Sequence, residues 1–85
     1  MERHLKGIAN HYRIEILLLL AEHGGSSLDD IVSALEANPK TIGEHTRRLY
    51  QAGLIEKKYR SQTVEHNLSP YGKFFVRFLK SFRDI

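Results

Sequence analysis

The sequence predicts a mainly α-helical protein that carries one small β-hairpin. Apolar residues recur at three- and four-residue steps in several stretches of the chain, which is the pattern of a buried helix face. The segments "LIEKKYR" and "TVEHNL" are instead rich in β-forming residues and stand two residues apart, which is typical of a hairpin. The length of 85 residues fits a single domain over 1–85, with a core so modest that a symmetric partner would add stability.

Composition excludes several classes of protein. The hydrophobic share of 41% and the charged share of 27% are ordinary for a globular domain. There is no cysteine, which excludes disulfides, thiolate metal sites and cysteine nucleophiles. The longest fully apolar run, residues 16–21, is too short to span a membrane, and "MERHLKG" lacks the apolar segment of a signal peptide. We therefore expect a soluble, cytoplasmic protein without a membrane partner.

Charge is unevenly divided along the chain. Residues 1–36 hold three basic and six acidic side chains, whereas residues 37–85 hold ten basic and four acidic ones. A basic half of this kind attracts nucleic acid or an acidic partner. Uneven charge is also common in small domains, so a solvated surface explains the same distribution.

Residues 1–23 are predicted to be helical, and the segment around residues 17–20 is apolar on nearly all sides, which indicates the central buried element. Asn10 is a good N-cap residue that could divide this stretch into a short helix and a longer one. The order would then be four helices, the hairpin and a last helix. The glycines of "HGG" end the first helical stretch.

Two short helices follow. The first lies in "SSLDDIVSALEA", where Ser27 and Asp30 have the spacing of a capping box. The second begins at Asn38, a good N-cap, with Pro39 at the first helical position, and Gly53 closes it.

The second short helix has an inner and an outer face. Ile42, Thr46 and Leu49 mark the inner face. At about 100° per residue the opposite face carries Lys40, Glu44, Arg47 and Gln51, flanked by Thr41 and Arg48. This stripe fits a surface for a polyanion, and it also fits a merely solvated helix face.

The rest of the chain is predicted to form the hairpin and a final helix. Ser61 and Gln62 are expected at the hairpin tip, and Tyr59 fits a half-buried strand position better than a base-stacking role. Ser69 and Pro70 start the final helix, in which Gly72 weakens the first turn. That helix carries an aromatic-rich stripe of Phe74, Phe75, Phe78, Leu79 and Phe82.

Two short helices joined by "EANP" form a helix-turn-helix, and a β-ribbon directly after them is a wing. In this order the chain resembles winged-helix transcription regulators, and most of all the ArsR-like group. "LKGIANHYRIEILLLLAEHGG" is similar to the opening helices of that family, and "NPKTIGEHTRRLYQAGLIEKK" is similar to its recognition helix and first wing strand. "LSPYGK" is similar to the segment after the wing in related regulators, so the resemblance covers nearly the whole chain.

The resemblance implies a homodimeric regulator that binds double-stranded DNA in a sequence-specific manner. It implies that residues 38–52 form the recognition helix and that residues 57–68 form the wing, which follows the adjacent backbone or minor groove. The positions that approach the major groove are then Lys40, Thr41, Gly43, Glu44, His45 and Arg47. By their chemistry, Lys40, Arg47 and Arg48 suit phosphates or guanine, Gln51 suits adenine, and Lys58, Arg60 and Gln62 suit the backbone beside the wing.

Gly43 and Glu44 depart from the family pattern, which often has serine and a basic or polar residue there. A carboxylate at position 44 repels phosphate, yet it can accept a hydrogen bond from cytosine N4. It can also pair with Arg48 or Lys40 one helical turn away, which we favour.

The resemblance also implies a dimer built from the first and last helices. The aromatic stripe can pack within one subunit, or it can face a second copy, which we favour because so small a chain has little surface to cover so many rings. The expected interface consists of Leu5, Ile8, Tyr12, Phe74, Phe75, Phe78 and Phe82. Two recognition helices would then lie about 34 Å apart, which is one turn of DNA.

Other functions find less support in the sequence. No two of the five histidines are four residues apart, and no cysteine accompanies them, so we predict no metal and no cofactor. No nucleophile, base and orienting acid occur together, so no enzyme is expected, and no small-molecule effector is evident. Two alternatives stay open: a winged helix that contacts a protein in a transcription-related complex, and single-stranded or RNA binding through Tyr59 and the basic wing.

Overall fold

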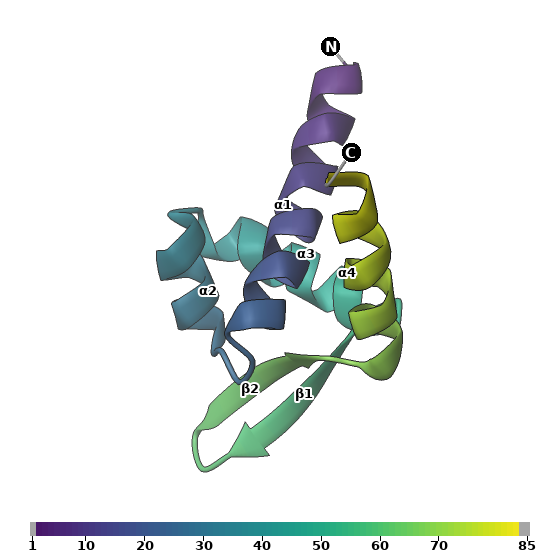
Figure 1. The fold of residues 1–85 in the computed structure, drawn as a ribbon. Coiled ribbons are helices and arrows are strands. Elements are labelled where there is room, and N and C mark those ends of the chain that lie inside the picture. The colour runs from purple at the N-terminus through teal and green to yellow at the C-terminus, as the bar shows by residue number, and fades with distance from the viewer. Residues whose placement is uncertain (1, 84–85) are drawn as a thin grey trace.

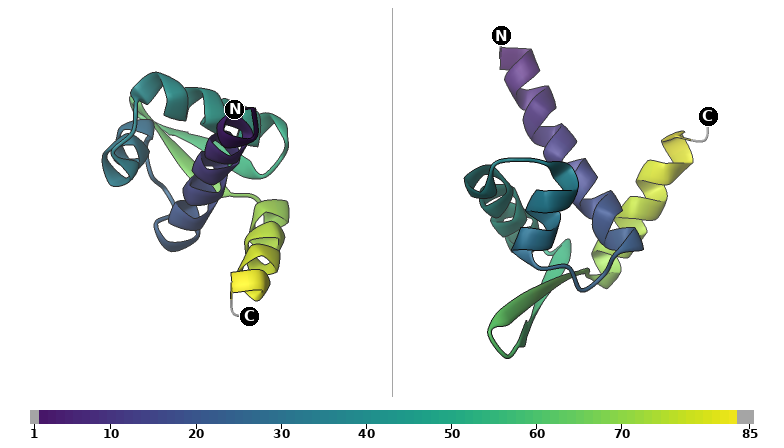
Figure 2. Two further views of the ribbon diagram at one scale, coloured as in Figure 1. Left: turned by 90° about the horizontal axis from the view of Figure 1, so that it is seen from above. Right: turned by 90° about the vertical axis from the view of Figure 1, so that its left-hand side faces the viewer.

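The computed structural model describes the backbone of residues 2–83 and the side chains of residues 11–82 (Figure 1). Its elements in chain order are α1 (Glu2–Glu22), α2 (Leu28–Leu35), α3 (Pro39–Gln51), β1 (Ile55–Arg60), β2 (Thr63–Leu68) and α4 (Pro70–Arg83). Helices α1 and α4 meet near the hairpin and diverge toward the two termini (Figure 2). The predicted fold class, helices with one β-hairpin that follows a helix-turn-helix, is confirmed.

Helix α1 is continuous, so the predicted division at Asn10 is wrong. The backbone is helical from Glu2 to Glu22. No proline interrupts this segment, and a break would leave the amides and carbonyls at two new helix ends without their helical partners. The described part of the chain therefore has three helices before the hairpin and one after it.

The core lies where α1, α2 and α3 meet the base of the hairpin and α4. Its buried members are Ile16, Leu17, Leu20, Ile31, Ile42, Leu49, Ile55, Leu68 and Val76. The first three belong to α1, which confirms that this helix is the central element. Leu18 and Leu19 are only partly buried and pack against the same cluster.

Helices α2 and α3 begin at the predicted caps. Ser27 Oγ accepts a hydrogen bond from Asp30 N at 3.1 Å, and Asp30 Oδ2 accepts one from Ser27 N at 3.0 Å, which completes the capping box. Asn38 Oδ1 accepts hydrogen bonds from Lys40 N at 2.8 Å and from Thr41 N at 3.3 Å. Both starts are therefore fixed by local side chains.

The two strands pair antiparallel, with Ile55 opposite Leu68 at the base. Ser61 and Gln62 form the turn, as predicted, and Ser61 has the positive φ, 52°, that the first central residue of a type II′ turn has. Tyr59 is 76% exposed, so the expectation of a half-buried tyrosine is wrong. The hairpin extends beyond the core at this point, and only its base is covered.

The loop between α1 and α2 pairs with the edge of β2. His66 N donates to Ser26 O at 2.8 Å, and Gly25 N donates to His66 O at 3.0 Å. The buried His66 ring places Nδ1 2.9 Å from the same Ser26 oxygen. These contacts join the wing to the helical part of the molecule.

Helix α4 starts against the chain that leaves α3. Ser69 Oγ accepts a hydrogen bond from Gly72 N at 2.9 Å and donates one to Gly53 O at 2.6 Å, which confirms Ser69 as the cap. Gly72 lies so close to Leu54 that an added Cβ would collide with the Leu54 carbonyl oxygen. The glycine that weakens the first turn is therefore required by packing.

Candidate nucleic-acid interface

Helix α3 has one face in the core and one in solvent. Its buried side chains are Ile42, His45, Thr46 and Leu49. Of the α3 residues predicted to approach DNA, Lys40, Arg47, Arg48 and Gln51 are exposed, and Thr41, Gly43 and Glu44 are partly exposed. We call the set of Lys40, Thr41, Glu44, Arg47, Arg48 and Gln51 the α3 outer face.

The N-terminal end of α3 already uses its first amides. Pro39 has no N–H group, and the amides of Lys40 and Thr41 donate to Asn38. A phosphate at this end would therefore meet the helix dipole and the Lys40 side chain, without free amides from these residues.

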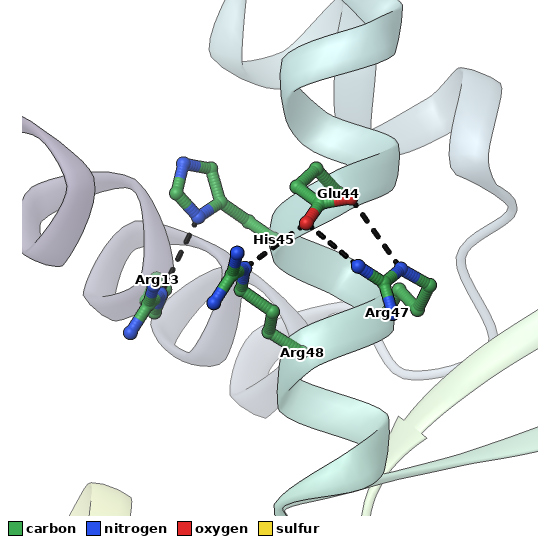
Figure 3. A network of polar contacts seen from close by, with 5 residues as sticks. All are labelled: Arg13, Glu44, His45, Arg47 and Arg48. Atoms are coloured by element: carbon green, nitrogen blue, oxygen red, sulfur yellow. Dashed lines mark hydrogen bonds and ion pairs between the residues drawn. The ribbon is translucent and has the colours of Figure 1, made fainter.

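Glu44 is bonded to both arginines that follow it on the outer face (Figure 3). Glu44 Oε1 accepts hydrogen bonds from Arg47 Nη2 at 2.7 Å and from Arg48 Nε at 3.1 Å, and Oε2 lies 3.4 Å from Arg47 Nε. The hydrogen bond from Arg47 is the largest cause that lowers the pKa of the Glu44 carboxyl, and Arg48 acts in the same direction. Pairing with Arg48 or Lys40 was expected; the structure shows Arg48 and adds Arg47 as a second partner. The ionised carboxylate offsets one of the two positive charges.

His45 does not belong to the outer face. The residue is only 8% exposed, and its ring stacks on that of Tyr12 with 5.8 Å between centroids. Figure 3 shows the contact with α1, in which Arg13 Nε donates to His45 Nδ1 at 3.4 Å. Burial is the main cause that lowers the pKa of His45, and the nearby charges of Arg13 and Arg48 add to it. We therefore omit the His45 ring from the set proposed to touch DNA.

The sequence did contain a signal for this burial. Ile42, His45, Thr46 and Leu49 stand at steps of three, one and three residues, so His45 falls on the same helix face as the three residues that marked the core. The partner Arg13, 32 residues earlier, was not predictable from local spacing.

The wing carries exposed polar and basic side chains. Lys58, Arg60 and Gln62, which were expected to face a phosphate backbone, are all exposed. Arg60 Nε lies 3.2 Å from Glu65 Oε1 on the opposite strand. Lys57 Nζ lies 4.6 Å from the centre of the Tyr50 ring, a cation–π contact between β1 and the end of α3 that the sequence reasoning missed.

Helix α4 leaves aromatic rings in solvent. Phe74, Phe78 and Phe82 are 66%, 50% and 59% exposed, whereas Phe75 is partly buried against the core. The rings of Phe78 and Phe82 meet edge to face at 4.8 Å between centroids. Among residues 11–82, nothing covers the outer rings of the stripe, and only Phe75 and Leu79 are partly buried. Among the other residues expected at the dimer interface, Tyr12 is partly buried, and the side chains of Leu5 and Ile8 lie outside the described residues.

A second basic surface lies between the hairpin and α4 and includes Lys58 of the wing. A groove of about 1180 Å³ opens between the end of α1, the hairpin and α4. Its charged lining consists of Lys57, Lys58, Lys73, Arg77, Lys80 and the single acid Glu56. The positive charge of the C-terminal half is therefore spread over two surfaces.

Metal sites and membrane spans find no support in the described residues. Within residues 11–82, no three histidine, aspartate or glutamate side chains gather closely enough to hold a metal ion. His11 and Glu15 form a single pair, with 3.8 Å between Nε2 and Oε1. None of the helices in the described part combines the length and hydropathy that crossing a bilayer requires.

The geometry defines a class of protein: a helix-turn-helix of α2 and α3 followed at once by a β-ribbon is a winged helix-turn-helix. Residues 10–57 match the family described as bacterial regulatory protein, arsR family. The chain belongs to the arsR family. This is a family of regulatory proteins.

One relative is the arsenical resistance operon repressor of Escherichia coli (strain K12). It is 32% identical over 66 residues, which make up 78% of this chain and 56% of that protein. The chain thus spans little more than half the length of this relative.

Solved structures with the same fold include DNA-binding regulators. BpsR of Bordetella bronchiseptica, whose DNA binding is regulated by 6-hydroxynicotinic acid, has a TM-score of 0.78 and 26% identity over 86% of this chain and 53% of its own. A point mutant of Staphylococcus aureus MepR bound to an oligodeoxyribonucleotide has a TM-score of 0.82 and 22% identity over 98% of this chain and 70% of its own. The second likeness is one of fold alone.

Proposed function

We propose that this protein is a sequence-specific transcriptional regulator that binds double-stranded DNA as a homodimer in the cytoplasm. The observation that carries the proposal is the α3 outer face, which presents exposed basic side chains on the second helix of a helix-turn-helix. Helix α3 is about 20 Å long at 1.5 Å per residue, and the major groove of B-DNA, about 12 Å wide, admits one such helix.

The exposed side chains suggest a division of roles. Lys40 lies at the N-terminal end of α3, where its charge and the helix dipole favour a phosphate. Arg47, Arg48 and Gln51 can reach base edges or the backbone, since arginine suits guanine and glutamine suits adenine. Lys58, Arg60 and Gln62 extend the contact along the wing.

The dimer is supported by α4. Three exposed phenylalanines in steps of four residues form an apolar strip that water solvates poorly, and a second copy of the same helix is a self-complementary cover for it. Known proteins support the DNA partner: DNA binding is regulated in BpsR, and the Escherichia coli relative is a repressor.

The test is selection of duplex fragments from a random library, followed by fluorescence anisotropy titration with the selected duplex. We expect a palindromic site whose half-sites are about one DNA turn apart, bound by two chains per duplex. Equal affinity for every duplex, or preference for a single-stranded competitor, would reject the proposal.

A second candidate function is contact with an acidic protein partner. The basic groove between α4 and the hairpin favours it, because no residue of the α3 outer face lines the groove. Lys58 is common to the groove and to the wing contacts proposed for DNA. A complex that survives nuclease treatment and is lost on Arg77→Glu, with duplex binding absent in the parent chain, would favour this function over the first.

A further inference from the structure

The carboxylate of Glu44 is the only acidic side chain on the α3 outer face, and it contacts both of that face's arginines. Its two oxygens lie 2.7 Å from Arg47 Nη2, 3.1 Å from Arg48 Nε and 3.4 Å from Arg47 Nε. The three side chains are about half exposed, with 44% for Glu44, 52% for Arg47 and 54% for Arg48. A ligand can therefore reach all of them at once.

The contact leaves donors available on both guanidinium groups. Arg47 uses Nε and Nη2 toward Glu44, and Arg48 uses Nε alone. Within the described residues, Arg47 Nη1 and both Nη atoms of Arg48 make no hydrogen bond. A guanidinium group has five N–H donors in a rigid plane, so each arginine can contact a base edge while it stays bonded to Glu44.

The same carboxylate has an opposite effect on phosphates. It brings a negative charge to the surface that DNA approaches, and it offsets part of the positive charge that attracts any duplex, whatever its sequence. A side chain that served only to strengthen DNA binding would be neutral or positive, whereas the Glu44 carboxylate is negative. The contacts of Glu44 instead hold the side chains of Arg47 and Arg48 in place before DNA binds. Less rotamer freedom is then lost when these arginines contact a base.

We propose that Glu44 is a specificity-determining residue: it holds Arg47 and Arg48 in position for base edges and weakens binding to DNA of unrelated sequence. The proposal rests on the proposed function and assigns a role to one residue of that interface. Glu44 acts through the two arginines and is a positioning residue.

The experiment compares Glu44→Ala with the parent chain on two duplexes, the selected site and an unrelated sequence of equal length, over a salt series. We expect Glu44→Ala to bind the unrelated duplex several-fold more tightly at low salt. The ratio between the two affinities should fall by roughly tenfold, since an ordered bidentate base contact contributes about that discrimination. For the unrelated duplex the slope of log affinity against log salt should steepen by about one for each further phosphate that the freed arginines neutralise.

Glu56→Ala is the matched control, because Glu56 is exposed on β1 and has no ion pair among the described residues. It removes the same charge, so it should change both affinities by one common factor and leave the ratio as it was. Glu44→Gln keeps a hydrogen-bond acceptor without the charge and should keep more of the discrimination than Glu44→Ala. Thermal unfolding of each variant shows whether the fold is kept.

Two results would overturn the proposal. If Glu44→Ala and Glu56→Ala change the two affinities by the same factors, Glu44 acts only through its negative charge. If Glu44→Ala lowers the affinity for both duplexes by the same factor, Glu44 only stabilises the helix. In either case the parent chain still discriminates between the duplexes, and the proposed function stands. If the parent chain binds no duplex, the proposed function fails first and the role of Glu44 fails with it.

Discussion

Helices α3 and α4 both leave one face in solvent, but the two faces differ in chemistry. The α3 outer face carries exposed lysine, arginine and glutamine side chains, and its one glutamate is paired with the two arginines. The exposed side chains of α4 include three phenylalanines that are at least half exposed. A charged face is well solvated when it is free, so it suits a partner that binds and leaves. An apolar face is costly in water, so it suits a permanent cover.

Helix α4 itself is divided in the same way. At about 100° per residue, Phe74, Phe78 and Phe82 fall on one flank and Lys73, Arg77 and Lys80 on the other. A second copy on the aromatic flank would leave the basic flank in solvent. The comparison therefore predicts that substitutions on the two flanks have different consequences.

The largest expected effect is on the dimer. Phe78→Ser with Phe82→Ser should weaken dimerisation by at least roughly 100-fold, because each buried phenylalanine contributes about 1.5–3 kcal/mol and both copies lose it. Sedimentation equilibrium measures this directly. Lys73→Ser with Arg77→Ser places the same residue on the opposite flank and should leave the association constant nearly unchanged. A parent chain that is monomeric at all concentrations would contradict the role of the aromatic flank as a dimer interface.

The next effect concerns the junction that fixes α4 beside the end of α3. Gly72→Ala should lower the free energy of unfolding by about 1–3 kcal/mol or more, because the added methyl group collides with the Leu54 carbonyl oxygen. Urea denaturation at neutral pH gives this value. Gly43→Ala is the control, since its Cβ would meet only the Leu28 side chain at an ordinary 3.9 Å. It should be neutral or slightly stabilising, as alanine favours helix. Equal losses for both variants would contradict the packing role of Gly72.

The smallest effect is a pH dependence from the buried side of α3. The pKa of His45 is lower in the folded state than the ordinary value near 6.5, because burial and the charges of Arg13 and Arg48 disfavour the imidazolium. The unfolded chain therefore binds the proton more readily, and stability is full above the unfolded pKa and is lost as the pH falls below it.

Urea denaturation at pH 7.5 and pH 5.5 tests this sign. We expect the parent chain to lose stability between the two values, and His45→Gln to lose less over the same interval. A parent chain that is more stable at pH 5.5, or a variant with the same pH dependence, would show that His45 is not the group responsible.

Local signals account for what the sequence predicted well. Ser27, Asn38 and Ser69 cap helices through bonds that span two or three residues, so short sequence windows contain them. The β-forming residues of the two strands and the turn at 61–62 are equally local. Long-range contacts account for the rest. The burial of His45 depends on α1, the requirement for Gly72 on Leu54, and the exposure of Tyr59 on how far the hairpin extends beyond the core.

The interface shows the same limit. The outer stripe of α3 was predictable from helical periodicity. The same periodicity places both Lys40 and Arg48 four residues from Glu44, so it does not decide which of them forms the ion pair. Side-chain geometry decides between them, and it brings in Arg47 at a spacing of three residues. The charge that DNA would meet is thus lower than a count of basic residues suggests.

The most direct test of the central claim is the salt dependence of affinity for the selected duplex, measured for the parent chain and for Arg47→Ala with Arg48→Ala. If the α3 outer face binds duplex DNA, log affinity falls linearly with log salt concentration. The double variant should bind roughly 10- to 1000-fold more weakly at low salt, with a shallower slope wherever these arginines contact phosphates. Duplex binding that ignores salt, or that the double substitution leaves intact, would contradict it.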